Sequence, residues 1–177
     1  DEKGFPWMPE LIDQLMEDYV RPGRVRFLLQ ANVSAPQYNP LSAKVLDKLK
    51  SYSPEQVELF GLDAPLSPDD YYALVSRADV VLLPYDRNRY RAFSSGTLAE
   101  AIAGGRPVVV PASSWMSSQI PLGAGETFHD FESFVEAVRR VVDDCDDYRS
   151  KAETCRAAWV ARHAPDRVAR RVARLAA

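Results

Sequence analysis

The chain has 177 residues, the size of one domain and long enough to bury a sizeable core. Its 22 Lys and Arg nearly balance its 25 Asp and Glu, so a net charge of −3 gives no global electrostatic reason to bind nucleic acid or an anionic membrane. No apolar run is long enough to span a membrane, and the start DEKGF is unlike a signal peptide, so we expect a cytoplasmic protein.

Segments of helical spacing alternate with short apolar runs along the chain, which is typical of a parallel sheet covered by helices on both faces. Helices are expected at residues 9–19, 39–52, 67–77, 131–142, 148–163 and 165–175, with a further one after Gly96. Strands are expected at residues 25–29, 56–60, 78–84 and 108–110, and near Thr127. The sequence therefore predicts an α/β fold of the Rossmann-like type.

Two short-range signals sharpen this pattern. Ser67 precedes Pro68, Asp69 and Asp70, which is the arrangement of an N-cap followed by proline at the first helical position. The run from Ala78 to Pro84 is continuously apolar after Asp79 and reads as a central buried strand. In such sheets ligands bind outside the carboxyl ends of the strands, so the loops after Phe60, Pro84 and Pro111 are expected at the ligand edge.

One of these loops, with the helix that follows it, has the features of an anion site. In YRAFSSGTLAEAIAGGRPVVVP, residues 90–111, small residues open directly into a helix. Ser94 or Ser95 can cap that helix, and Ser95, Gly96 and Thr97 present free backbone N–H groups and the positive end of the helix dipole to a phosphate. Glu100 shares the helix face of Gly96 and can accept hydrogen bonds from an adjacent ribose; the alternative is an ordinary capped helix with Glu100 in solvent.

Three arginines precede this helix. Arg87, Arg89 and Arg91 form a local positive patch on an acidic protein, and Arg91 is the candidate phosphate ligand among them. A solvated surface is the alternative for the patch. The acidic run at residues 143–147 lacks convergent partners, and neither cysteine belongs to a metal-binding pattern, so we predict no metal site.

The chain from about Asp1 to Ala176 resembles the C-terminal, donor-binding domain of GT-B retaining glycosyltransferases, a group that includes many enzymes of bacterial polysaccharide biosynthesis. The resemblance is carried, in order, by Lys3-Gly4, by Gly61 before LSPDDYYALVSRADVVLLPY, by SSGTLAEAIAGGRPVVVP and by Gly123 to Gly125. It implies a Rossmann-like domain that forms one half of a GT-B fold and uses a nucleotide diphosphate sugar as donor substrate, with no separate cofactor.

The resemblance also implies roles for single residues. Lys3 and the amides of Ser95, Gly96 and Thr97 correspond to the groups that hold the donor diphosphate. Glu100 matches the second Glu of a Glu-x7-Glu motif, which holds the ribose hydroxyls, and Leu66 corresponds to backbone that meets the base. The leaving diphosphate would be stabilised by these groups and the helix dipole.

Two departures from the family pattern bear on activity. Ala92 stands where the motif has its first Glu, which contacts the donor sugar, so sugar recognition is altered or supplied elsewhere. A GT-B enzyme also needs an N-terminal acceptor domain, for which 177 residues leave no room. We therefore expect residues 1–177 to be a single domain of a larger enzyme, inactive by itself, whose partners are the donor and that N-terminal domain.

Other functions stay open at this point. A non-catalytic interaction or regulatory domain that keeps the fold is favoured by Ala92. A nucleotide-sugar epimerase would need acidic and His residues at the sugar, which the sequence does not offer. The last helix alternates arginines with apolar residues and could mimic a basic membrane helix, although packing against the N-terminal domain is the preferred interpretation.

Overall fold

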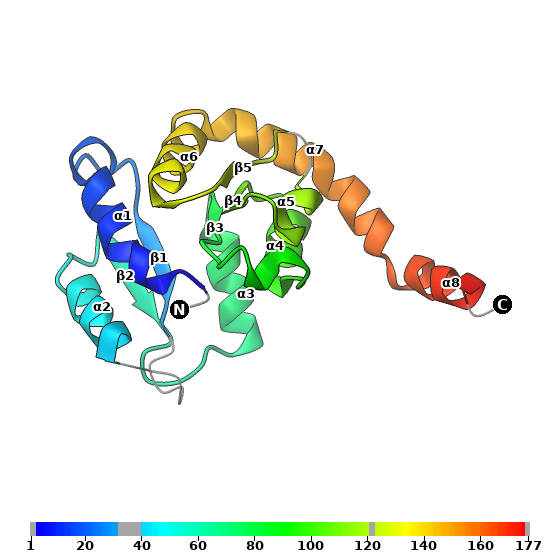
Figure 1. Ribbon diagram of the computed structural model, residues 1–177, viewed down its shortest axis with the longest axis horizontal. Helices are drawn as coiled ribbons and strands as arrows, with labels where there is room; N and C mark the ends of the chain where they lie inside the picture. The colour runs from blue at the N-terminus through cyan, green and yellow to red at the C-terminus, as the bar shows by residue number, and fades with distance from the viewer. Residues whose placement is uncertain (1–2, 32–39, 121–122, 176–177) are drawn as a thin grey trace.

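All five strands of the structure run parallel. The structure is a computed structural model that describes residues 3–31, 40–120 and 123–175 (Figure 1). Strands β1 (Phe27–Gln30) and β2 (Val57–Phe60) form one pair, while β3 (Val81–Leu82), β4 (Val108–Pro111) and β5 (Gly125–Phe128) form a three-stranded sheet in that order. Phe27 lies opposite Val57, and Val108 lies between Val81 and Gly125. The predicted parallel α/β architecture is confirmed, with the strands divided between two hydrogen-bonded groups.

Helices follow almost every strand. In chain order they are η1 (Phe5–Trp7), α1 (Met8–Leu15), η2 (Met16–Val20), α2 (Pro40–Lys50), α3 (Pro68–Arg77), η3 (Arg89–Arg91), α4 (Gly96–Ala103), α5 (Trp115–Gln119), α6 (Phe131–Asp143), α7 (Cys145–His163) and α8 (Pro165–Leu175). Asn39, the expected start of α2, lies outside the described residues. The expected helix from residue 9 divides after Leu15, where the backbone changes to the wider π-helix η2.

The cap predictions are confirmed by side-chain geometry. The Ser67 side chain accepts a hydrogen bond from the backbone N–H of Asp70 at 3.2 Å, with Pro68 in the first turn of α3. The Ser95 side chain accepts one from the backbone N–H of Leu98 at 3.2 Å and begins α4. Local capping chemistry therefore sets the start of both helices that frame the site.

The expected central strand is shorter than its apolar run. Of residues 78–84, only Val81 and Leu82 form β3. Asp79 lies at the surface and pairs with Arg149 of α7. The hydrogen bonds to β4 come from the backbone N–H groups of Val81 and Leu83, and the strand ends before Tyr85, whose N–H donates to the Leu83 carbonyl oxygen at 2.7 Å.

The core has two clusters, one on each side of β4. Val109 packs into the first, which contains residues of α1, α2, α6, β1 and β2. Val108 and Val110 pack into the second, with Leu98 and Ile102 of α4 and other residues of α5 and α7. Because side chains alternate along a strand, β4 faces helices on both sides, as predicted.

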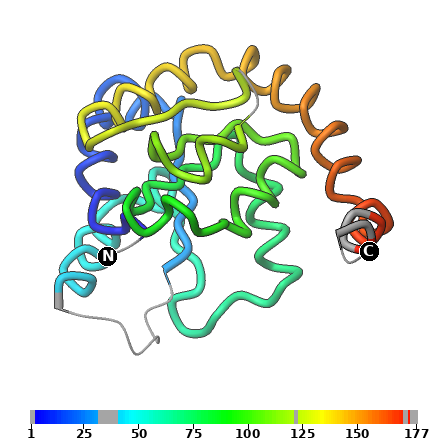
Figure 2. Tube along the Cα trace, turned by 45° about the vertical axis from the view of Figure 1, so that its right-hand side comes forward, coloured from blue at the N-terminus to red at the C-terminus, as the bar shows by residue number. Residues whose placement is uncertain are grey.

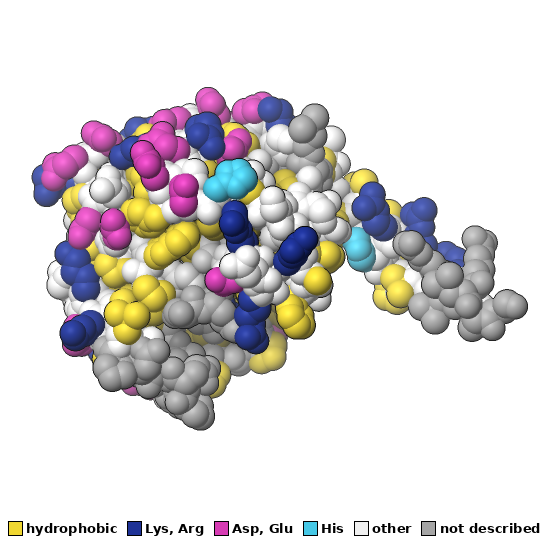
Figure 3. Space-filling view, viewed as in Figure 1, with side chains coloured by type: hydrophobic (Ala, Val, Ile, Leu, Met, Phe, Trp, Pro, Cys, Tyr) yellow, Lys and Arg dark blue, Asp and Glu magenta, His cyan; other side chains and the backbone are white. Residues whose placement is uncertain are grey.

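The carboxyl-terminal helices extend away from this core. α7 crosses the domain, and α8 stands apart from the body in both views (Figures 1 and 2). Acidic side chains gather over α6 and the first turns of α7 (Figure 3). Among the described helices, none has the length and apolar character needed to cross a membrane.

Candidate functional site

The first turn of α4 presents an open backbone surface. Ser95 is buried and caps the helix, whereas Gly96 is exposed. A Cβ built on Gly96 would meet no atom within 4 Å, so a ligand can approach this backbone closely. The Gly96 and Thr97 N–H groups belong to the first turn, where a helix has no carbonyl partners of its own to offer. The first turn of α4 therefore leaves backbone N–H groups without helical partners beside an exposed glycine, and the anion site at Ser95, Gly96 and Thr97 stays a prediction.

One turn further along α4, Glu100 is held by a tyrosine from α3. The Tyr71 hydroxyl donates to Glu100 Oε2 at 2.7 Å, and its oxygen lies 3.4 Å from Thr97 Oγ1. Both residues are half-buried. Burial of the hydroxyl is the main cause that raises the pKa of Tyr71 to about 12; Glu100 adds to the increase, while Thr97 opposes it. Tyr71 therefore stays protonated, and a hydrogen-bond donor, throughout the physiological pH range.

The charge of Glu100 is not neutralised by its surroundings. Among the residues that the structure describes, no Lys, Arg or His forms an ion pair with its carboxylate. A half-buried carboxylate is a strong acceptor that favours further donors. The prediction that Glu100 points only into solvent is therefore not supported, because one of its oxygens is already engaged.

Lys3 lies near the end of β3. Gly4 has a φ of 71°, and a Cβ at this position would lie 2.0 Å from the carbonyl oxygen of Pro84, so only glycine fits here. This close packing brings Lys3 to Tyr85, with Lys3 Nζ 6.0 Å from the ring centroid.

Leu66 sits in the loop between β2 and α3, directly before the Ser67 cap. It is half-buried, and its Cγ lies 3.9 Å from the position of a Cβ built on Gly61. The loop therefore turns back over the end of β2 through the positive φ of 73° at Gly61. Leu66 precedes the N-cap of α3 and Tyr71 lies within that helix, so the predicted base contact and the residue that holds Glu100 belong to neighbouring parts of one segment.

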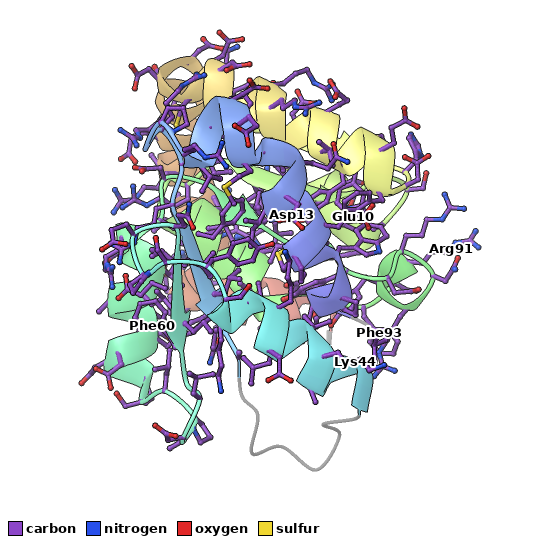
Figure 4. The ribbon with its side chains drawn as sticks, turned by 90° about the vertical axis from the view of Figure 1, so that its left-hand side faces the viewer. Glu10, Asp13, Lys44, Phe60, Arg91 and Phe93 are labelled. Atoms are coloured by element: carbon purple, nitrogen blue, oxygen red, sulfur yellow. The ribbon has the colours of Figure 1, made fainter. Side chains whose placement is uncertain are left out.

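Arg91 lies exposed at the surface of the molecule. It belongs to η3, and its side chain points away from the body, beside exposed Phe93 (Figure 4). Ala92 is also exposed between them. The Arg91–phosphate contact stays a prediction.

A shallow pocket of about 480 Å³ adjoins Glu100 on the side away from Gly96. Besides Glu100 it is lined by residues of α3, α4 and α7 and by one loop arginine: Tyr72, Val75, Ser76, Ala103, Gly104, Arg106 and Arg156. The Arg106 guanidinium is tied to the Ser76 carbonyl oxygen at 2.7 Å. The other predicted ligand residues, Lys3, Leu66, Arg91 and Ser95 to Thr97, do not line this pocket.

Acidic residues where α6 meets α7 form hydrogen bonds and ion pairs within the protein. Asp143 accepts hydrogen bonds from Tyr19 and from Arg24, each at 2.9 Å, and Asp147 pairs with Lys151 at 2.6 Å. Within the described part of the chain, no group of three or more His, Cys, Asp or Glu could hold a metal ion. Cys145 and Cys155 are free and half-buried.

Three aromatic residues near the site were not predicted to take part: Tyr71, Tyr85 and Phe93. Phe93 is 65% exposed, although an aromatic side chain of its size is usually covered. Its position directly before the small-residue loop could have indicated that it lies near the site. Tyr71 and Tyr85 gave none, because their roles depend on contacts between segments far apart in the chain.

Comparison with known proteins identifies a family. A sequence model of the family described as glycosyl transferase-like matches residues 39–174, about three quarters of the chain. The matched range includes Leu66, Tyr71, the start of α4 and Glu100, whereas Lys3 lies before it. A search of curated proteins finds no match to this chain.

Proposed function

The chain belongs to the glycosyl transferase-like family, and from this premise we propose that it binds a nucleotide diphosphate sugar at the amino end of α4. The observation that carries the proposal is Glu100, a half-buried carboxylate without an ion pair among the described residues, one turn from the open backbone at Gly96. Backbone N–H groups that can donate to a phosphate, one turn from a carboxylate that can accept from a diol, fit a diphosphate joined to ribose.

The diphosphate would lie on the first turn of α4. The N–H groups of Gly96 and Thr97 would donate to its oxygens, and the helix dipole would favour its charge. Lys3, held near the end of β3 by the Gly4–Pro84 packing, would supply a point charge. As the bond between sugar and phosphate breaks, the same groups would stabilise the charge that develops on the leaving diphosphate.

The nucleoside would extend from there toward α3. Glu100 would accept from the ribose hydroxyls, and the loop at Leu66 would meet the base. The intact enzyme would transfer the sugar to a glycan or another acceptor. An N-terminal acceptor domain and a cytoplasmic location belong to this proposal as expectations from the resemblance.

A second function is favoured by one observation. Ala92 lies exposed directly before the α4 loop, where the family motif places a sugar-binding Glu. A domain that has lost this contact could act as a non-catalytic interaction module. Nucleotide binding distinguishes the two functions, because a module without donor chemistry has no reason to retain it.

Calorimetric titration of residues 1–177 with UDP, GDP and ADP tests the proposal. We expect saturable binding of one nucleotide, and we expect Glu100→Ala to weaken it by roughly 10- to 100-fold, the scale of a lost hydrogen bond to a charged group. Glu132→Ala is the control, since Glu132 is exposed in the first turn of α6 and belongs to neither of the helices α3 and α4. Absence of binding, or equal binding by the Glu100 variant, would contradict the proposal.

A further inference from the structure

Tyr71 joins the two helices that frame the site. Its backbone N–H donates to the Ser67 carbonyl oxygen at 2.9 Å, so its place in the first turns of α3 is fixed by the Ser67 cap. Its hydroxyl crosses to α4, where it donates to Glu100 at 2.7 Å and lies 3.4 Å from Thr97 Oγ1. Thr97 and Glu100 are three positions apart and share one face of α4.

The hydrogen bond from Tyr71 restricts the orientation of the Glu100 carboxylate without neutralising its charge. A glutamate side chain has several rotatable bonds, and a donor fixed on one oxygen reduces the orientations that the carboxylate can take. The phenol is neutral, so Glu100 keeps its full negative charge, and its second oxygen can still accept. An arginine in the same place would orient the carboxylate but would also satisfy it.

The chain contains a second Tyr–Glu pair that shows this difference. Tyr148 of α7 donates to Glu126 of β5, and Arg140 of α6 holds the other Glu126 oxygen at 3.0 Å. Glu126 is thus satisfied inside the protein. Glu100 has the tyrosine but, among the described residues, no such cation.

We propose that Tyr71 is a positioning residue that aligns the Glu100 carboxylate with the vicinal diol of a ribose, and so makes the site prefer ribonucleotides to 2′-deoxyribonucleotides. This inference rests on the proposed function. A carboxylate held in one orientation can accept from two neighbouring hydroxyls at once, and an analogue with one hydroxyl leaves part of that capacity unused. A carboxylate free to rotate adapts to either sugar and discriminates less.

The test is a comparison of one nucleotide pair on three proteins. The nucleoside diphosphate that residues 1–177 bind, among UDP, GDP and ADP, is titrated beside its 2′-deoxy analogue against the unmodified chain, Tyr71→Phe and Tyr148→Phe. Phenylalanine keeps the ring and removes only the hydroxyl. Tyr148→Phe is the matched control, because it also removes a hydroxyl from a glutamate, at a contact between α7 and β5 that involves no residue of α3 or α4.

We expect the unmodified chain to bind the ribonucleotide roughly tenfold more tightly than the deoxy analogue, the scale of one lost hydrogen bond. Tyr71→Phe should weaken ribonucleotide binding about 3- to 10-fold and deoxynucleotide binding less, so that the ratio falls toward one. Tyr148→Phe should leave both affinities and their ratio unchanged. A purely structural role for Tyr71 would weaken both ligands alike and leave the ratio where it was.

Two results would overturn the inference, and they differ from each other. If the unmodified chain binds the ribonucleotide and Tyr71→Phe preserves the ratio, Tyr71 is not a positioning residue, while the proposed function stands. If the unmodified chain binds no nucleotide, the proposed function fails and the inference fails with it. Adding Glu100→Gln to Tyr71→Phe gives an internal check, because the two losses should not add if the tyrosine acts through the glutamate.

Discussion

The two Tyr–Glu pairs of this domain have the same chemistry and different surroundings. Tyr71 and Tyr148 are both half-buried, both donate to a glutamate, and burial raises the pKa of each to about 12. Arg140 also pairs with Glu126, whereas Glu100 has no such cation among the described residues and lines a shallow pocket one turn from exposed Gly96. The comparison teaches that one tyrosine donor does not by itself give a half-buried carboxylate a purely structural role. What distinguishes a binding carboxylate is acceptor capacity left over at a place that a ligand can reach.

The largest expected effects are losses of stability on replacing Gly4, which precedes the Glu100 site, or Gly125, which lies in the strand of Glu126. Ala at Gly4 would strain a positive φ and meet Pro84 at 2.0 Å, and we expect it to lower the free energy of unfolding by roughly 2–4 kcal/mol. Ala at Gly125 would meet Val108 of the neighbouring strand at 2.3 Å, for which we expect about 1–3 kcal/mol. Urea unfolding measures both.

Nucleotide binding separates these two variants. Gly4→Ala should also weaken nucleotide affinity in the fraction that stays folded, because it moves Lys3 away from Tyr85. Gly125→Ala should leave the affinity of its folded fraction intact. If Gly4→Ala bound nucleotide as well as the unmodified chain, Lys3 would have to be removed from the site.

Replacing each glutamate by glutamine separates structure from binding more directly. Glu126→Gln weakens the contacts to Arg140 and Tyr148, and we expect it to lower the free energy of unfolding by about 1–3 kcal/mol with unchanged nucleotide affinity. Glu100→Gln should cost less stability and lower nucleotide affinity roughly tenfold or more. Thermal unfolding and calorimetry on both variants check this. Reversed effects would mean that Glu100 is the structural carboxylate.

The helix caps supply a smaller contrast. Ser95→Ala removes the cap of α4 and Ser114→Ala the cap of α5, and we expect each to cost about 1 kcal/mol of stability. Only Ser95→Ala should also reduce nucleotide affinity, because fraying of the first turn disturbs the Gly96 and Thr97 amides. Equal affinity in both variants would argue against phosphate binding at this helix end.

The smallest expected effect is a titration at high pH. Because the folded pKa of both tyrosines lies near 12 and the ordinary value is 10, their contribution to stability is complete below pH 10 and is lost as the pH rises toward 12. Tyr71→Phe and Tyr148→Phe should each remove one late component from the tyrosinate absorbance curve. Bound nucleotide should delay the ionisation of Tyr71 and leave that of Tyr148 unchanged.

Much of the fold was predictable because its signals are local. The caps at Ser67 and Ser95 and the valine run of β4 each lie within a few residues of the chain, and the structure confirms them. The predicted length of β3 was wrong, because the residues of an apolar run that pair with a neighbouring strand are set by that strand, here β4, and not by the run itself. Helix α5 was not predicted, because its five residues are too few to show a helical repeat of apolar residues.

The site was predictable at its backbone and less so at its side chains. Serine, glycine and threonine at the start of α4 indicated a capped helix start with an anion site, and the structure confirms the cap while the anion site stays a prediction. The Tyr71–Glu100 bond spans 29 positions and depends on how α3 packs against α4, which no local pattern encodes. The surplus acceptor capacity of Glu100, on which the functional proposal depends, is therefore visible only in three dimensions.

The most direct measurement is the backbone amide NMR spectrum of residues 1–177 during titration with UDP, GDP and ADP. The account predicts saturable shifts that are largest at Gly96, Thr97 and Glu100 for one of these nucleotides, with little change at Glu126 and Tyr148. Shifts confined to other parts of the domain, or none with any of the three, would contradict the claim that the amino end of α4 and Glu100 hold a nucleoside diphosphate.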